Sequence, residues 1–211
     1  MAPRAYNNET RQQQQAQLKT RIAAAAAELH ARKGALATSY AEIAEHAGVS
    51  VPTVYKHYPD LDLLVRGCSG HVSEQAPPLP VKEILDCPDL PAAAERLVGA
   101  IDRLHAYYEP WQVWREQGRI PALAERAQEA RERITDLCAA VLAAHGVPGD
   151  RREIAALWES LLQFDLWHRL ARVHEFSRAA VRRRLVQLLL AAIGPQPVTP
   201  TSPRPTARRS P

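Results

Sequence analysis

The first apolar positions of the chain recur with the period of an α-helix. The residues that would share one face of this helix are Leu18, Ile22, Ala25, Ala26 and Leu29. Gly34 follows them and is typical of the residue that ends a helix. The preceding residues 1–17 are polar and low in complexity, so they are predicted to form a flexible arm, either disordered or a frayed helix.

A second, shorter helix is predicted to begin after Ser39. Ser39 and Glu42 have the spacing of a capping box, in which each side chain accepts a hydrogen bond from the other residue's backbone amide. The buried face of this helix is predicted to contain Tyr40, Ile43, Ala44 and Ala47. Gly48 then breaks the helix, with a positive φ expected at the turn.

A third helix is predicted to follow that turn at once. Ser50 is its expected N-cap, and Pro52 is tolerated because it falls in the first turn. The sequence Tyr58-Pro59-Asp60 ends this helix, and Asp60 is the expected N-cap of a fourth.

The remainder of the chain shows only helical periodicity. A proline-rich connection is expected over residues 75–91. The helices expected beyond it are approximately 92–109, 110–117, 122–145, 150–173 and 177–193. The pattern therefore predicts an all-α protein with an N-terminal helix-turn-helix domain over 18–66 (motif 39–58) and a second helical domain over 67–194. Residues 195–211, rich in proline and arginine, are predicted to be a disordered tail.

Composition favours a soluble protein with an anionic partner. Hydrophobic residues make up 46% of the chain and charged residues 24%, which is ordinary for a globular domain. The chain has neither an apolar run long enough to span a membrane nor a secretory signal, so a cytoplasmic location without membrane contact is expected. The three cysteines fit reduced thiols. The net charge is +4, and its positive excess lies at the two ends, in tails that are either simply solvated or close to phosphates.

The segment 39–58 has the spacing of a DNA-binding helix-turn-helix. Ala44 and Ala47 are small where two helices would cross, and Gly48 supplies the turn. The exposed face of the second helix would carry hydrogen-bond donors suited to phosphates and base edges: Thr53, Tyr55, Lys56 and His57. A helix-turn-helix can also be an ordinary helical corner, but the absence of acidic residues between Ser50 and Pro59 favours DNA binding.

The stretch from Arg21 to Leu64 resembles the N-terminal domain of the tetracycline-repressor (TetR) family. The residues that carry the resemblance are Arg21-Ile22, Ala25-Ala26, Leu29, Gly34, Thr38-Ser39, Ile43-Ala44, Ala47-Gly48-Val49-Ser50, Thr53, Tyr55, His57-Tyr58-Pro59 and Leu63-Leu64. The resemblance implies a three-helix DNA-binding domain, and a fourth helix that links it to a ligand-binding, dimer-forming domain. It also implies that a ligand usually releases the protein from DNA.

The resemblance also implies which residues meet the DNA. Contacts with phosphates would come from Thr38, Ser39, Ser50, Thr53, Tyr55 and His57, and contacts with base edges from Val51, Pro52 and Lys56. One position departs from the pattern, because Leu61 stands where the family often has a lysine that reaches a phosphate. Arg4, Arg11 or Lys19 could supply a replacement contact from the N-terminal arm.

Aromatic and polar residues of the second domain are candidates for a ligand pocket. These are His105, Tyr108, Trp111, Trp114, Trp158, Phe164, Trp167 and His168, with Tyr107, Gln112 and Gln163 nearby. Aromatic residues at helical spacing usually pack in a core, and an aromatic-walled pocket with a few polar groups is the alternative. A planar or hydrophobic small-molecule effector is therefore expected.

The last two helices carry long apolar faces that would pack either inside one subunit or against a twin. A homodimer would read a palindromic operator in double-stranded DNA. No catalytic motif, metal-ligand pattern or cofactor signature appears, although Asp165 and His168 stand three residues apart on one helix. The sequence therefore predicts a transcriptional regulator rather than an enzyme, and the family resemblance implies a repressor. The alternative is a helical small-molecule-binding or scaffold protein with a vestigial helix-turn-helix.

Overall fold

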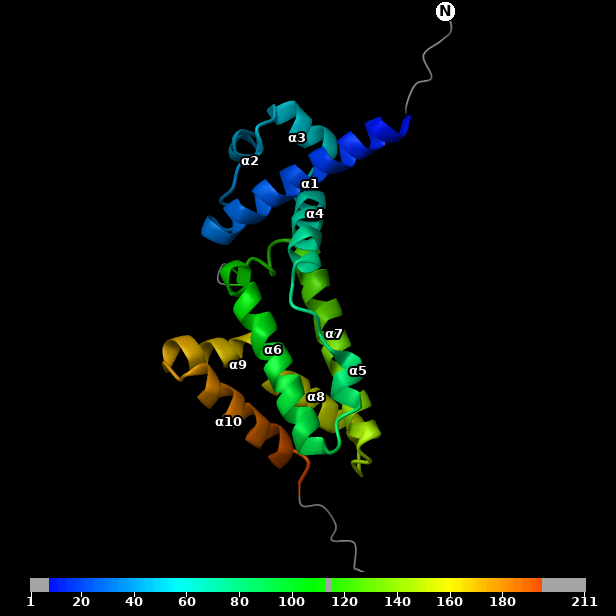
Figure 1. Ribbon diagram of the computed structural model, residues 1–211. Helices are drawn as coiled ribbons and strands as arrows, with labels where there is room; N and C mark the ends of the chain where they lie inside the picture. Colours follow the sequence, from blue (N-terminus) through cyan, green and yellow to red (C-terminus); the bar gives the residue numbers. More distant parts are fainter. Residues whose placement is uncertain (1–7, 113–114, 195–211) are drawn as a thin grey trace, which may run out of the picture.

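The fold consists of helices joined by short turns. The computed structural model describes residues 8–112 and 115–194, and no strand occurs within those ranges. The helices are α1 (Asn8–Lys33), α2 (Tyr40–Ala47), α3 (Val51–His57), α4 (Leu61–Glu74), α5 (Val81–Leu85), α6 (Leu90–Gln112), α7 (Pro121–Ala144), α8 (Arg151–Leu161), α9 (Phe164–His168), the π-helix η1 (Arg169–Val173) and α10 (Arg178–Ala191). Figure 1 shows α1, α2 and α3 grouped at one end of the molecule, with α4 leading from them to the rest.

The first helix begins ten residues earlier than the apolar period predicts. Residues 8–17 are helical although the side chains of 11–17 are all exposed, because glutamine and arginine have good intrinsic helix propensity. Further along, α1 packs against α2 and α4 through small side chains. Ala23, Ala25, Ala26 and Ala27 are all buried, and alanine lets neighbouring helices approach closely.

The predicted capping box, the turn at Gly48 and the Asp60 cap are confirmed, whereas Ser50, the predicted N-cap of α3, makes no side-chain bond to that helix. The Ser39 hydroxyl accepts from the Glu42 amide, and the Glu42 carboxylate accepts from the Ser39 amide. Gly48 ends α2 with φ 63°, a left-handed conformation that favours glycine. The Asp60 carboxylate accepts from the Leu63 amide and caps α4. These local bonds fix where α2 and α4 begin and where α2 ends.

The N-terminal domain has its own apolar core. Ile22, Ile43, Val54 and Leu64, one residue from each of the first four helices, are fully buried. Burying side chains of this size stabilises the fold by about 1.5–3 kcal/mol each. The core therefore holds α3 in a fixed orientation on α1 and α4.

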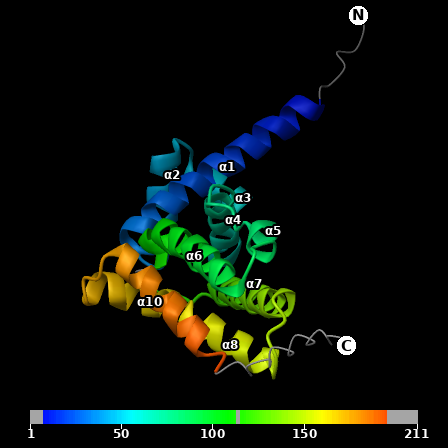
Figure 2. The ribbon, with the colours of Figure 1, turned by 60° about the horizontal axis from the view of Figure 1, so that its bottom comes forward.

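The remaining helices form a second, larger core. Figure 2 shows α6, α7, α8 and α10 packed together. Leu97, Leu142, Trp158 and Leu189 lie at their centre and are fully buried. No helix in the described ranges is both long and apolar enough to cross a membrane.

Several helix boundaries in this domain differ from the sequence prediction. The helices predicted at 92–109 and 110–117 are not separated at Pro110, because α6 continues through this residue to Gln112. Pro110 removes one helical hydrogen bond, but it lies in the last turn, where little helix follows. A short helix, α5, interrupts the predicted connection 75–91, and its Ile84 is buried in the core.

The single helix predicted over 150–173 is broken at Leu162–Gln163. Gln163 is extended (φ −64°, ψ 146°), and α9 begins after it with buried Phe164. The chain then continues into η1. This break turns Phe164 and Trp167 into the core, where one straight helix would have carried them elsewhere. The segments 1–17 and 195–211 were predicted as arm and tail; residues 1–7 and 195–211 lie outside the described ranges.

Candidate nucleic-acid interface

The helix α3 has one buried face and one exposed face. Val54 and Tyr58 are buried, whereas Tyr55 is 53% exposed and Pro52 and Lys56 are also exposed. Val51, Thr53 and His57 are half-buried at the edges of this face. Figure 1 shows α3 with α2 at the end of the molecule away from α8 and α10. The candidate residues of α3 are thus brought together on one accessible surface.

Hydroxyl groups gather at the start of α3. The Ser50 and Thr53 hydroxyl oxygens are 2.8 Å apart and hydrogen-bonded to each other. Ser50 is the N-cap residue, but its side chain makes no cap bond to the helix backbone. The Ser50 hydroxyl therefore does not cap the helix and is able to contact a ligand such as a phosphate.

Tyr55 is held in place by a second tyrosine. The rings of Tyr40 and Tyr55 have centroids 4.5 Å apart and are tilted by 38°. The Tyr40 hydroxyl oxygen is buried without a hydrogen-bond partner among the described residues. Its burial, followed by the nearby Asp60 and Tyr55, raises the pKa of Tyr40 to about 12. Tyr40 is thus a neutral platform that orients the exposed Tyr55.

The two candidates before α2 are engaged within the protein. The Thr38 hydroxyl donates to the Gly34 carbonyl oxygen over 2.7 Å, and the Ser39 hydroxyl takes part in the capping box. Glu42 beside them forms an ion pair with Lys33. The hydrogen bond from Lys33, followed by those from Ser39, lowers the pKa of Glu42 to about 2. A phosphate at this point would have to compete with an ionised carboxylate, so the face of α3 is the better-supported contact surface.

The position that departs from the family pattern has a packing role. Leu61, the first residue of α4, is half-buried and packs against the core of the N-terminal domain. It also packs against a small cluster of Ala35, Val65, Ile120 and Ala122 at the junction of the two domains. A lysine would not fill this place with apolar atoms alone, which gives a structural reason for leucine here.

The basic side chains of α3 are not engaged in ion pairs with the described residues. Within the described ranges of the chain, Lys56 and His57 form no ion pair. By contrast Lys33 is paired with Glu42, and His46 lies 2.6 Å from the Glu28 carboxylate. An unpaired lysine on an exposed helix suits a polyanionic partner.

Three candidates of the second domain, Trp158, Phe164 and Trp167, are buried core residues, and the half-buried His105 packs against the last two. The Trp158 indole N–H donates to the Leu189 carbonyl oxygen, and the Trp167 indole N–H donates to Asp102, each over 2.8 Å. His105 Nε2 donates to the Leu162 carbonyl oxygen over 2.8 Å. Burial lowers the pKa of His105, so the ring is neutral near pH 7.

The aromatic residues near the end of α6 lie elsewhere, against the N-terminal domain. The Tyr107 hydroxyl donates to the Val72 carbonyl oxygen, the Tyr108 hydroxyl to the Ser73 hydroxyl, and the Trp111 indole N–H to the Ala27 carbonyl oxygen. Tyr108 and Trp111 therefore connect domains and do not meet His105, Trp158, Phe164 and Trp167. Trp114 lies outside the described residues.

One hollow in the second domain includes a candidate residue. Its volume is about 440 Å³, and it is lined by Arg115, Asp165, His168 and Arg169. Sequence spacing placed Asp165 and His168 on one face, but it missed Arg115, which is 50 positions distant from Asp165 and approaches it only through the fold. Phe164 lies beside this hollow, with its ring centroid 5.4 Å from that of His168.

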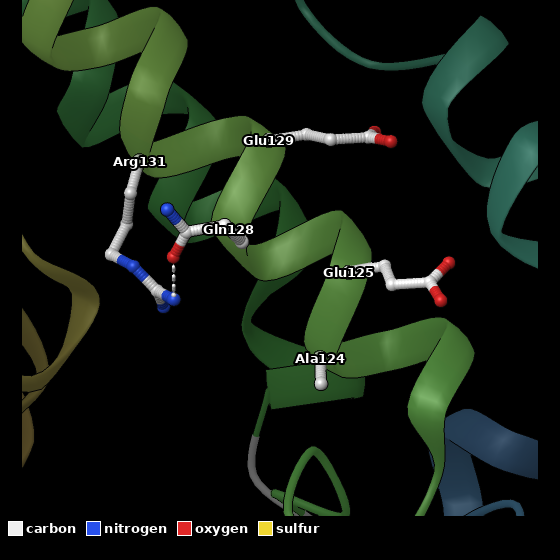
Figure 3. Close-up of a pocket in the computed structure, with 5 residues that line it drawn as sticks. All are labelled: Ala124, Glu125, Gln128, Glu129 and Arg131. Atoms are coloured by element: carbon white, nitrogen blue, oxygen red, sulfur yellow. Dashed lines mark hydrogen bonds between the residues drawn. The ribbon is translucent and has the colours of Figure 1, made fainter.

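A second hollow, of about 600 Å³, lies along α7. Figure 3 shows Glu125 and Glu129 projecting to one side of this helix, with Gln128 and Arg131 elsewhere around it. Arg131 donates to Gln128, and Glu125 is paired with Arg66 of α4. These groups already satisfy one another on an exposed helix face. No cluster of three potential metal ligands occurs among the residues that the structure describes.

Comparison with known proteins identifies the first domain. Residues 22–66 match the model of the bacterial regulatory proteins of the tetR family. No curated protein matches the sequence.

Solved structures share the fold over most of the chain. NalD, the secondary repressor of the MexAB-OprM multidrug efflux pump in Pseudomonas aeruginosa, is 20% identical (TM-score 0.64), covering 84% of this chain and 97% of that one. A TetR-like regulator from Rhodococcus sp. RHA1 is 21% identical (TM-score 0.62; 82% and 93% covered). A putative TetR-family regulator from Mesorhizobium loti is 23% identical (TM-score 0.62; 85% and 96% covered). Residues 22–66 therefore match the DNA-binding domain of the tetR-family regulatory proteins, and the chain as a whole shares the fold of solved TetR-like regulators.

Proposed function

We propose that the protein is a homodimeric repressor that binds a palindromic operator through α3 and is released by a small-molecule effector. The observation that carries the proposal is the exposed face of α3, which presents Tyr55, Lys56 and the hydroxyls of Ser50 and Thr53 on a rigid core. Donors of this kind bind phosphates and base edges. The protein would act in the cytoplasm, where the DNA is.

Exposed apolar residues support the dimer. Leu157 of α8 is 47% exposed and Leu188 of α10 is 45% exposed. The two helices contact each other, so a twin subunit packed against them would bury both side chains. A two-fold axis would set two copies of α3 against the two halves of a palindrome.

Release by an effector requires a ligand that binds the free and DNA-bound conformations with different affinity. NalD, whose fold the chain shares, is described as a repressor. Tyr108 and Trp111, which connect the second domain to α1 and α4, offer a route by which a ligand could alter the position of α3.

The test is selection of bound sequences from a random duplex library. We expect the natural protein to enrich a palindrome, with an affinity that falls steeply with salt as counterions are released. Lys56→Gln should weaken binding to the selected duplex by about 1–3 kcal/mol if Lys56 contacts a base edge. Lys82→Gln on α5, whose lysine is paired with Asp86, is the matched control and should bind like the natural protein. If no sequence is enriched at low salt, the protein is instead a helical binding protein with a vestigial helix-turn-helix.

A further inference from the structure

The hollow lined by Arg115, Asp165, His168 and Arg169 has an excess of positive groups. It holds two arginines against one carboxylate, with the His168 ring beside them. Arg115 forms an ion pair with Asp165. Arg169 forms no ion pair within the described residues, whereas Arg172 and Arg178, which follow it in sequence, are paired with Glu109 and Asp102. Arg169 is thus available to bind an anion that the described residues do not supply.

An aromatic ring lies beside these basic side chains. The Arg115 guanidinium carbon is 5.7 Å from the centroid of the Phe164 ring, and the His168 ring packs against the same phenylalanine. The volume, about 440 Å³, is within the range of small-molecule sites. Cationic groups beside aromatic surfaces suit a planar molecule that bears a carboxylate, because the ring packs while the arginine binds the two oxygens.

The residue next to the hollow contacts the helix-turn-helix. The Glu116 carboxylate accepts hydrogen bonds from the backbone amides of Ala35 (2.6 Å) and Leu36 (2.9 Å), in the turn that leads from α1 to α2. Arg115 therefore faces the hollow while its neighbour holds a turn of the DNA-binding domain. Arg115 also has φ 43°, a conformation that residues other than glycine rarely adopt and that only surrounding contacts maintain.

We propose that this hollow binds a planar organic carboxylate, which draws Arg115 away from Asp165, and that the resulting shift of the backbone loosens the contact of Glu116 with residues 35–36. The turn before α2 then loses two hydrogen bonds, and the α2–α3 pair loses its fixed position. The inference deepens the proposed function: the site and the ligand class stand alone, and only the effect on DNA rests on operator binding.

Binding is tested first without DNA. Benzoate, 2-naphthoate and biphenyl-4-carboxylate are titrated calorimetrically at millimolar concentration, with their uncharged carboxamides as controls. At least one carboxylate should bind saturably and its carboxamide should not. Arg169→Gln should weaken that binding about tenfold or more, as expected for loss of a charge-assisted hydrogen bond. Arg133→Gln, which replaces an exposed arginine of α7, is the control and should leave the affinity for the carboxylate unchanged. Absence of binding by all three acids, or equal binding by Arg169→Gln, overturns the site.

The coupling is tested by amide hydrogen exchange of Ala35 and Leu36. Saturating carboxylate should raise the exchange rates of both amides severalfold, because they lose the Glu116 oxygens. In Glu116→Gln both amides should exchange faster than in the natural protein from the start and change less when the acid is added, while affinity for the acid is kept. Unchanged exchange in the saturated natural protein overturns the coupling. Because this measurement contains no DNA, a failure to find an operator would leave it intact and would count only against the proposed function.

Discussion

The two domains hold their helices together in different ways. In the N-terminal domain, Ala23, Ala26 and Ala44 let short helices pack closely, and the caps that define them bond to residues three or four positions away. In the second domain, bulky Trp158 and Trp167 fill the core, and their indole N–H groups bond to elements 31 and 65 positions distant. Close packing in the N-terminal domain keeps α3 rigid. The second domain instead depends on a few directional hydrogen bonds that join elements distant in sequence.

The largest expected effect tests those directional bonds. Asp102 is 1% exposed and accepts from both Trp167 and Arg178. Asp102→Ala should lower the free energy of unfolding by about 2–4 kcal/mol, somewhat below the usual figure for a buried pair because Arg178 is half-exposed and can reach water. Urea denaturation measures it. Asp136→Asn, exposed on α7, should stay close to the natural value; equal loss in both variants would contradict the role given to Asp102.

The next effect tests close packing in the first domain. A Cβ atom at Gly67 of α4 would lie 2.5 Å from the Tyr58 ring, whereas one at Gly70 would meet nothing within 4 Å. Gly67→Ala should therefore destabilise by about 1–3 kcal/mol through overpacking. Gly70→Ala, in the same helix, should stabilise by about 0.5–1 kcal/mol through helix propensity. Thermal or urea unfolding compares them, and equal stabilities would show that Tyr58 moves aside freely.

The pH dependence tests a buried polar residue of the first domain. Burial, opposed to some extent by Glu116, lowers the pKa of His30 from 6.5 to about 4. Below pH 6.5 the unfolded chain binds a proton that the folded chain does not, so the free energy of unfolding falls as the pH drops towards 4. The slope from this group approaches about 1.4 kcal/mol per pH unit inside that window.

Urea titrations at several pH values measure this slope. His30→Gln should reduce it, and His174→Gln, whose side chain is exposed, should leave it in place. Burial also lowers the pKa of His105 in the second domain, which adds a contribution of the same sign. If the dependence of the unfolding free energy on pH is the same in His30→Gln as in the natural protein, the result would count against a neutral His30 in the folded state.

The smallest expected effect distinguishes two serines, Ser39 and Ser50, that each occupy the N-cap position of a helix. Ser39 caps α2 with its hydroxyl, whereas Ser50 makes no cap bond to α3. Ser39→Ala should cost about 1 kcal/mol of stability. Ser50→Ala should cost less stability but lower affinity for the selected duplex. Unfolding and DNA titration of both variants give the answer, and a larger stability loss in Ser50→Ala would reverse the assignment.

Sequence reasoning succeeded where the determining contacts are local. The capping box of Ser39 and Glu42, the turn at Gly48 and the cap at Asp60 are each set within a few residues, and all three were predicted. The family resemblance rests on the same segment.

The other features of the fold and of the candidate site depend on contacts between residues far apart in the sequence, which residue spacing does not predict. Glu116 bonds to amides 80 and 81 positions away, and Arg178 reaches Asp102 across 76. The crowding of aromatic residues around position 110 was visible, but nothing in it tells that Tyr108 and Trp111 face the first domain. The break before Phe164 was missed because Gln163 carries no helix-ending signal.

Gly34 has a consequence for how this sequence can change over time. The residue adopts φ 87°, and an added Cβ would lie 2.8 Å from a Glu116 oxygen. Position 34 is thus restricted twice, once by its own backbone and once by a residue of the other domain. In a set of homologues, we expect positions 34 and 116 to covary: lineages that keep the glutamate keep the glycine, and those that lose the glutamate relax only the second restriction.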